Sequence, residues 1–183
     1  LITFLNLVPD RNRRIHPFFC GFAAGATALT TSGRGALIVF AAFLTILSRG
    51  NKADIWKYIG GGASISALML LYAIANGSLV ATYQDVIVFA AAKYSGIEAV
   101  PFGRSIGVQN FAVGLMFPVA AVLAILVLLQ SRLRLLRDYD FRAALAFGMA
   151  GFVGCFPRPD AWHLLCAAPL ILPLLSISLV RIP

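Results

Sequence analysis

Residues 155–165, CFPRPDAWHLL, hold three side chains that are able to bind an anionic or polar ligand. Arg158, Asp160 and His163 stand here between two strongly apolar stretches. Prolines on both sides of Arg158 predict that no helix runs through it, and Asp160 suits the N-cap of a helix that restarts there. Because a charged break at a membrane boundary costs free energy, it usually marks a cavity or a bound polar ligand.

A second candidate is Arg34, which lies between two glycines in TTSGRGAL. Either its guanidinium binds phosphate bidentately in a membrane-embedded cavity, or the side chain extends to the interface as lipid-facing arginines do. The C-terminal cluster has the same two interpretations. Arg158 binds phosphate while Asp160 or His163 contacts a sugar or orients the arginine, or Arg158 and Asp160 close a turn as an ion pair and His163 packs.

The composition defines the class of protein that must position these residues. Of 183 residues, 60% are hydrophobic and 12% are charged, whereas soluble domains carry about 25% charged residues. We therefore expect an integral membrane protein. The net charge of +8 is concentrated in basic loops that alternate with poorly charged ones, which follows the positive-inside pattern and argues against nucleic-acid binding. The basic residues of these loops are Arg11, Arg13 and Arg14, then Arg49, Lys52 and Lys57, then Arg132, Arg134, Arg137 and Arg142.

The apolar segments predict an all-α polytopic transmembrane helix bundle with short discontinuous helices and one interfacial juxtamembrane helix. The first two short segments form either one crossing or a hairpin, and the hairpin places the basic loops on one side. Arg34, residues 78–106 and the Arg158 cluster then share the non-cytoplasmic side. The expected spans are 18–31, 36–48, 59–76, 107–130, 142–156 and 160–180, in a single domain that lacks N-terminal spans, with the interfacial helix at 80–94.

Other polar residues have more than one interpretation. Asp85 and Lys93 lie two turns apart on the interfacial helix and either line the mouth of a cavity or face water. Arg104 follows in a loop, where it is either solvated or a ligand contact.

Glycines at 21 and 25, at 60–62 and at 148, 151 and 154 predict close helix contacts. The aromatic residues Trp56, Tyr58 and Trp162 are interpreted as interface anchors. The three cysteines, Cys20, Cys155 and Cys166, lie in apolar surroundings without metal-ligand spacing, so we expect them to be buried and free.

Three stretches resemble the GT-C superfamily of polytopic glycosyltransferases, which includes relatives of protein mannosyltransferases and of the lipid A aminoarabinose transferase. GFAAGATALTTSGRGALIVF resembles a glycine-rich pair of short helices with a basic residue in its turn, here Arg34. LVATYQDVIVFAAAKYSGIEAVPF resembles a juxtamembrane helix and its following loop. GCFPRPDAWHLLCAAPLILPLL resembles an R-x-D-x-x-H segment near the end of the membrane domain, matching Arg158, Asp160 and His163.

The resemblance implies transfer of a sugar from a polyprenyl-phosphate donor to a glycan, lipid or protein acceptor in the bacterial inner membrane. It assigns the donor phosphate to Arg34 and Arg158, positioning to Asp160 and His163, and a lid contact to Lys93 or Arg104. We expect no cofactor and assign no metal ligand, and the sequence does not fix whether a metal is needed. The family's acidic base lies in a first external loop that nothing here matches, so we expect the catalytic residue outside this chain.

Two other functions remain open at this stage. A transporter or flippase for a lipid-linked or anionic solute also fits the short, broken helices. A non-catalytic membrane subunit, in which the charged turns only set topology, is the third.

Overall fold

The computed structural model describes residues 16–89, 92, 111–156, 159 and 161–181, and helices are its regular secondary structure. Three of the helices, α4, α8 and α10, are long and apolar enough to cross a membrane. The predicted fold class is therefore confirmed, and the chain is a multi-pass membrane protein. The helices are α2 (Pro17–Thr30), α3 (Ser32–Leu47), α4 (Lys52–Ala75), α5 (Leu79–Tyr83), the π-helix η1 (Gln84–Phe89), α8 (Phe111–Gln130), the 3₁₀-helix η3 (Arg134–Arg137), α9 (Tyr139–Val153) and α10 (Ala161–Arg181).

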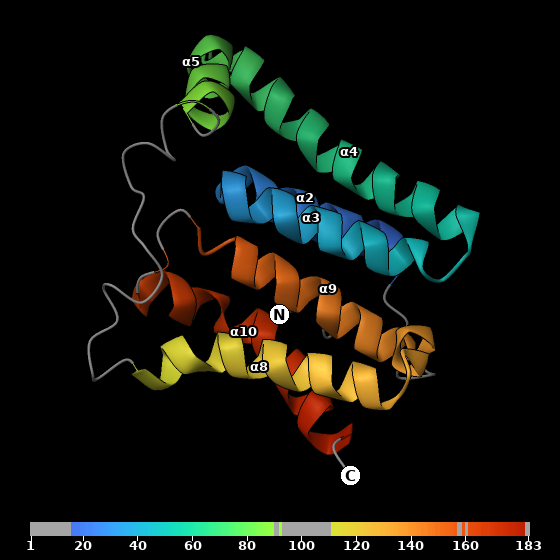
Figure 1. The fold of residues 1–183 in the computed structure, drawn as a ribbon. Helices are drawn as coiled ribbons and strands as arrows, with labels where there is room; N and C mark the ends of the chain where they lie inside the picture. The colour runs from blue at the N-terminus through green and yellow to red at the C-terminus, as the bar shows by residue number, and fades with distance from the viewer. Residues whose placement is uncertain (1–15, 90–91, 93–110, 157–158, 160, 182–183) are drawn as a thin grey trace.

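Helices α2, α3, α4, α8, α9 and α10 run roughly along one direction, and the chain reverses between α2 and α3, between α3 and α4 and between α8 and α9 (Figure 1). Helix α2 packs on α4 and α3, α3 packs on α9, α9 packs on α10, and α10 packs on α8. Helix α9 thus joins the α2–α3–α4 group to the α8–α10 pair. Its inner position explains why its small residues, including Ala143, Ala144 and Gly148, are buried.

Helices α2 and α3 form a hairpin whose connection is the single residue Thr31. Their 14 and 16 residues give lengths of roughly 21 and 24 Å, less than the roughly 30 Å of a bilayer core. The Thr31 hydroxyl and amide both donate to the Thr27 carbonyl at 2.9 Å, which satisfies an end of α2 at the reversal. Helix α3 begins at Ser32, so Arg34 lies in its first turn and not in a longer polar loop.

Glycines let α2 and α4 approach closely, as the sequence predicts. A Cβ on Gly21 would overlap the Tyr58 carbonyl, and a Cβ on Gly61 would overlap the Phe18 carbonyl. Because those atoms belong to backbone, no side-chain rotation would relieve the overlap. The third glycine group has the same role in α9, where a Cβ on Gly151 would lie 2.9 Å from Leu170 Cβ of α10.

Two predictions about single side chains are wrong: Tyr58 is not an interface anchor, and Cys166 is not buried. Tyr58 is buried at 4% exposure and donates from its hydroxyl to the Val39 carbonyl at 2.8 Å, because it faces α3 and not the interface. Trp56 and Trp162 are exposed at 72% and 75%, as interface anchors require. Cys166 is exposed, whereas the other two cysteines are buried, and no disulfide joins any of the three.

The position of Cys166 on α10 explains its exposure. The buried face of this helix repeats every three or four residues, and position 166 falls between its members. The buried positions of α10 are Leu164, Ala167, Ile171, Leu174 and Ser178.

The segment expected to be one interfacial helix at 80–94 is divided. Helix α5 covers Leu79–Tyr83, and the π-helix η1 continues over Gln84–Phe89. Tyr83 is 59% exposed, which suits an interfacial anchor. Lys93, Tyr94 and Arg104 lie outside the described residues.

Candidate functional site

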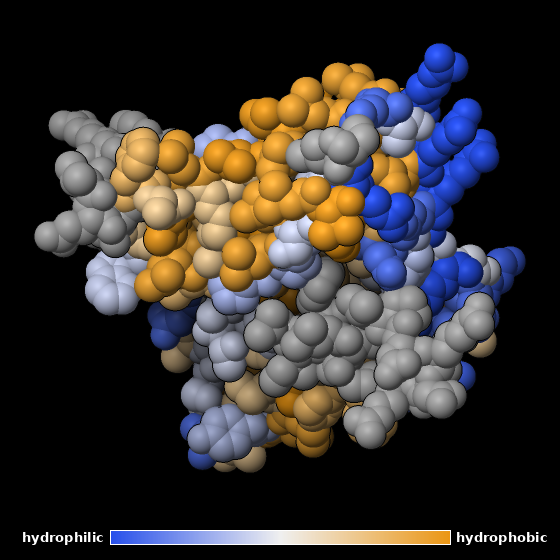
Figure 2. Space-filling view, turned by 90° about the horizontal axis from the view of Figure 1, so that it is seen from below, coloured by the Kyte–Doolittle hydropathy of each residue, from blue (hydrophilic) through white to orange (hydrophobic). Residues whose placement is uncertain are grey.

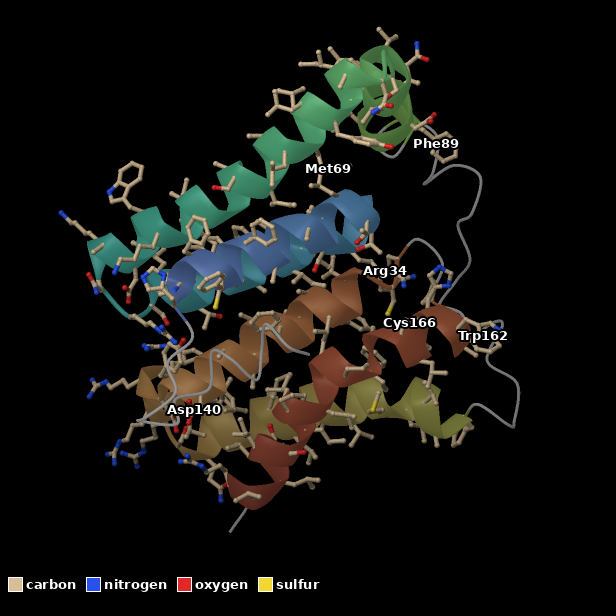
Figure 3. All side chains as sticks on the ribbon, turned by 180° about the vertical axis from the view of Figure 1, so that it is seen from behind. Arg34, Met69, Phe89, Asp140, Trp162 and Cys166 are labelled. Atoms are coloured by element: carbon tan, nitrogen blue, oxygen red, sulfur yellow. The ribbon has the colours of Figure 1, made fainter. Side chains whose placement is uncertain are left out.

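The described polar side chains divide between two ends of the bundle. We call the end that holds the α3–α4 connection, η3 and the start of α9 the basic end, and the end that holds the α2–α3 turn and the start of α10 the distal end. The basic end is on the right of Figure 1. Figure 2 shows hydrophilic residues gathered on the same side and hydrophobic surface over much of the rest of this face. Figure 3, seen from behind, places Asp140 at the basic end and Arg34, Trp162 and Cys166 at the distal end.

Arg34 connects two helices that are distant in sequence. Its Nε donates to the carbonyl of Gly154 at 2.9 Å, although the two residues are 120 positions apart. Gly154 is the C-cap of α9, and a Cβ on it would lie 3.3 Å from Arg34 Cγ. The absence of a side chain at position 154 therefore lets the arginine stem lie against the end of α9.

The bond gives Arg34 a structural role that the sequence did not reveal. A cation at a helix C-terminus is favourable, and carbonyls at that end have no partner within the helix. Since Nε makes this bond, the two Nη groups remain as the donors that face away from it. Among the described residues they have no hydrogen-bond partner.

The α9–α10 connection begins beside Arg34 and is closely packed where it is described. Cys155 is 1% exposed, and its thiol lies 3.2 Å from the Gly151 carbonyl and 3.6 Å from the His163 carbonyl. Pro159 is also fully buried. These contacts hold the end of α9 against the first turn of α10, where His163 lies partly buried.

The candidate residues thus fall into three groups. Arg34 and His163 share the distal end, and Arg34 binds a carbonyl four residues before Arg158. Asp85 is exposed on η1, which packs on α5 beyond the end of α4, as the green segment at the upper left of Figure 1 shows. Arg158, Asp160, Lys93 and Arg104 lie outside the described residues, so their side chains are not placed.

Sequence reasoning missed the contacts of an arginine that joins two helices at the basic end. Arg142, in the first turns of α9, donates from Nη2 to the carbonyl of Ser48, the C-cap of α3, at 3.3 Å. Its Nη1 donates to the Leu136 carbonyl at 3.2 Å. The contacts between the antiparallel helices α3 and α9 are thus reciprocal. Arg34 of α3 binds the C-cap carbonyl of α9, and Arg142 of α9 binds the C-cap carbonyl of α3. An arginine early in each of two apolar helices was the available signal.

Further polar contacts fix the basic end. The Arg49 Nε donates to the Tyr139 hydroxyl at 2.8 Å, and its guanidinium carbon lies 5.1 Å from the centre of that ring. Arg181 and Asp138 form an ion pair at 2.8 Å, which joins the end of α10 to the start of α9. Burial raises the pKa of Asp140, which precedes the predicted span 142–156; nearby Asp138 raises it further and Arg181 opposes the shift.

Two cavities border α9. The first, of about 430 Å³, lies between α3 and α9 and reaches from Ser48 and Arg142 to Leu37 and Val153. We call it the α3–α9 groove. The second, of about 290 Å³, is lined by apolar residues of α8, α9 and α10 and includes no charged side chain among its described lining residues.

No protein-family model, characterised protein or solved structure matches this chain. Within the described residues, no group of three or more histidine, cysteine, aspartate or glutamate side chains is placed to hold a metal ion. The chemistry of the site therefore has to be argued from its own cations and their surroundings.

Proposed function

We propose that this chain is part of a membrane glycosyltransferase that transfers a sugar from a polyprenyl-phosphate donor on the non-cytoplasmic face of a bacterial inner membrane. The supporting observation is that Arg34 binds the Gly154 carbonyl, four residues before Arg158. A guanidinium from the first hairpin thereby contacts the C-terminus of α9, from which the chain continues to Arg158. The two basic segments that the structure describes, 49–57 and 132–142, lie at the opposite end, as expected for a non-cytoplasmic donor site.

The proposed chemistry is a displacement at the anomeric carbon of the donor sugar. The bond between that carbon and the phosphate oxygen breaks, and its electron pair stays on the phosphate. An acceptor oxygen forms the new bond to the anomeric carbon and gives its proton to an acidic base, which we expect outside this chain. Fixed cations in a pocket of low dielectric constant stabilise the charge that develops on the departing phosphate.

Arg34 is suited to that task by the way it is held. Its Nε bond to Gly154 fixes the plane of the guanidinium before any ligand arrives. The two Nη groups then offer the paired donors that match two phosphate oxygens. Arg158 supplies the second cation, and Asp160 and His163 position it or contact the sugar.

The test measures glycosyl transfer from a radiolabelled polyprenyl-phosphate sugar in membranes that contain the full-length protein. We expect Arg34→Lys and Arg158→Gln to lower transfer at least tenfold. Arg132→Gln, which removes an exposed charge at the basic end, is the matched control and should leave transfer unchanged.

A second control separates loss of donor binding from loss of packing. Gly151→Ala pushes α9 against Leu170 of α10 and changes no charge. If this variant is as destabilised as Arg34→Lys and loses as much transfer, the effect at Arg34 is structural. Full transfer in both Arg34→Lys and Arg158→Gln would refute the proposal.

Transport of a lipid-linked or anionic solute is the second candidate function. The observation that favours it is the α2–α3 hairpin, whose helices are shorter than a bilayer core and meet at a polar reversal. Labelling of Arg34→Cys, in a chain whose other cysteines are replaced, distinguishes the two functions. Modification by a membrane-impermeant thiol reagent from both faces favours transport, and modification from one face favours the transferase.

A further inference from the structure

The α3–α9 groove is apolar along most of its length and has a charged residue at one end. Ten of the residues that line it are apolar side chains or Thr45, and the remaining two, Ser48 and Arg142, lie together at the basic end. The groove follows α3 from Ser48 to Leu37, which at 1.5 Å per residue is roughly 16 Å. Phe40 and Met149 on its rim are 58% and 53% exposed, so the groove opens on the side of the bundle.

These dimensions fit a single hydrocarbon chain. A volume of about 430 Å³ lies within the range of roughly 300–1,000 Å³ that ligand sites occupy. The groove has a polar group only where it reaches the basic end, so a molecule that fills it has an apolar tail and a polar group at one terminus. Membrane lipids have this form.

The positive charge of Arg142 at the basic end of the groove favours lipids with an anionic head group. Arg142 donates from both Nη groups to backbone carbonyls, while its Nε is buried and has no hydrogen-bond partner among the described residues. A buried donor without a partner is unfavourable, and an incoming acceptor oxygen would satisfy it. Exposed Arg132, Arg134 and Arg137 lie on the neighbouring turn and η3, so arginines outnumber the two aspartates, Asp138 and Asp140, at the start of α9.

We propose that the α3–α9 groove binds one acyl chain of an anionic phospholipid from the leaflet at the basic end, with its phosphate at Arg142. Basic pockets between transmembrane helices at the cytoplasmic side are suited to such head groups. Because Arg142 also binds the Ser48 carbonyl, the bound lipid stabilises the contact between α3 and α9. This site lies at the opposite end of α3 from Arg34 and does not depend on the proposed glycosyl transfer.

The experiment measures lipid binding to the purified full-length protein by native mass spectrometry, with phosphatidylglycerol and phosphatidylcholine of identical acyl chains as probes. We expect phosphatidylglycerol to bind at least tenfold more tightly than phosphatidylcholine. Arg142→Gln should remove that preference, and Arg132→Gln, which changes an exposed charge at the same end, should retain most of it.

A second pair of variants tests the groove itself and remains informative if Arg142→Gln does not fold. Met149 lines the α3–α9 groove and also the adjoining apolar cavity, so Met149→Trp narrows both, whereas Val122→Trp adds a bulky side chain to an exposed position of α8 outside both cavities. We expect only Met149→Trp to lower phosphatidylglycerol binding, by fivefold or more.

Three results would overturn the proposal. Equal binding of the two phospholipids would show that the head group is not recognised. Equal binding by Met149→Trp and Val122→Trp would show that the chain does not enter the groove. Displacement of phosphatidylglycerol by polyprenyl phosphate in a manner that depends on Arg142 would assign the groove to the donor instead.

Discussion

The bond between Arg34 and Gly154 supports the most direct prediction about this protein. Methionine at position 34 keeps an unbranched stem of similar length against Gly154 but has no donor for its carbonyl. The chain then loses a charged hydrogen bond, worth about 1.5–3 kcal/mol, and a cation at the end of α9, worth about 0.3–1 kcal/mol. We expect Arg34→Met to lower the free energy of unfolding by about 2–4 kcal/mol.

Reversible unfolding by SDS in mixed micelles measures this difference. Arg34→Lys keeps a cation near the carbonyl without the rigid guanidinium, so its loss should be about half as large. Arg132→Met is the matched control, because it removes an exposed arginine from the other end and should change stability by less than about 0.5 kcal/mol. If Arg34→Met and Arg132→Met have the same stability, the reasoning about the α9 C-terminus is wrong.

Two further predictions concern packing and accessibility. Gly61→Ala should destabilise the protein by about 1–3 kcal/mol in the same assay, because the new Cβ meets the Phe18 carbonyl of α2. Gly60→Ala has space for its Cβ and should be neutral or slightly stabilising. Equal effects of the two substitutions on stability would contradict the close α2–α4 contact. N-ethylmaleimide should modify Cys166 in detergent while the buried thiols of Cys20 and Cys155 remain unmodified, and intact-mass spectrometry counts the modified thiols. Modification of all three cysteines at one rate would contradict the described burial.

Several features of the fold could be predicted from local sequence. An apolar run of about 20 residues has to become a helix in a bilayer, since no water is there to bind its backbone groups, and α4, α8 and α10 follow this rule. The short apolar segments around Arg34 likewise predicted two helices. Glycine spacing predicted close contacts because a missing Cβ is a local property, and Gly21 and Gly61 make such contacts.

Predictions about which face of a helix is buried were less successful. Tyr58 and Cys166 both lie in apolar helices whose composition is similar on every side. Only the neighbouring helix decides whether such a residue faces protein or lipid. Tyr58 is buried because α3 offers the Val39 carbonyl, and Cys166 is exposed because α8 and α9 both pack on the other faces of α10.

The sequence by itself determined the helical class, the long apolar segments and the separation of the basic segments from Arg34, because these depend on composition and on charge along the chain. The tertiary structure decided what the two arginines of α3 and α9 bind. Arg34 and Gly154 are 120 residues apart, and Arg142 and Ser48 are 94 apart. No local pattern encodes either pair, because each depends on two antiparallel helices meeting at a particular register, which is fixed by the packing of small residues between them.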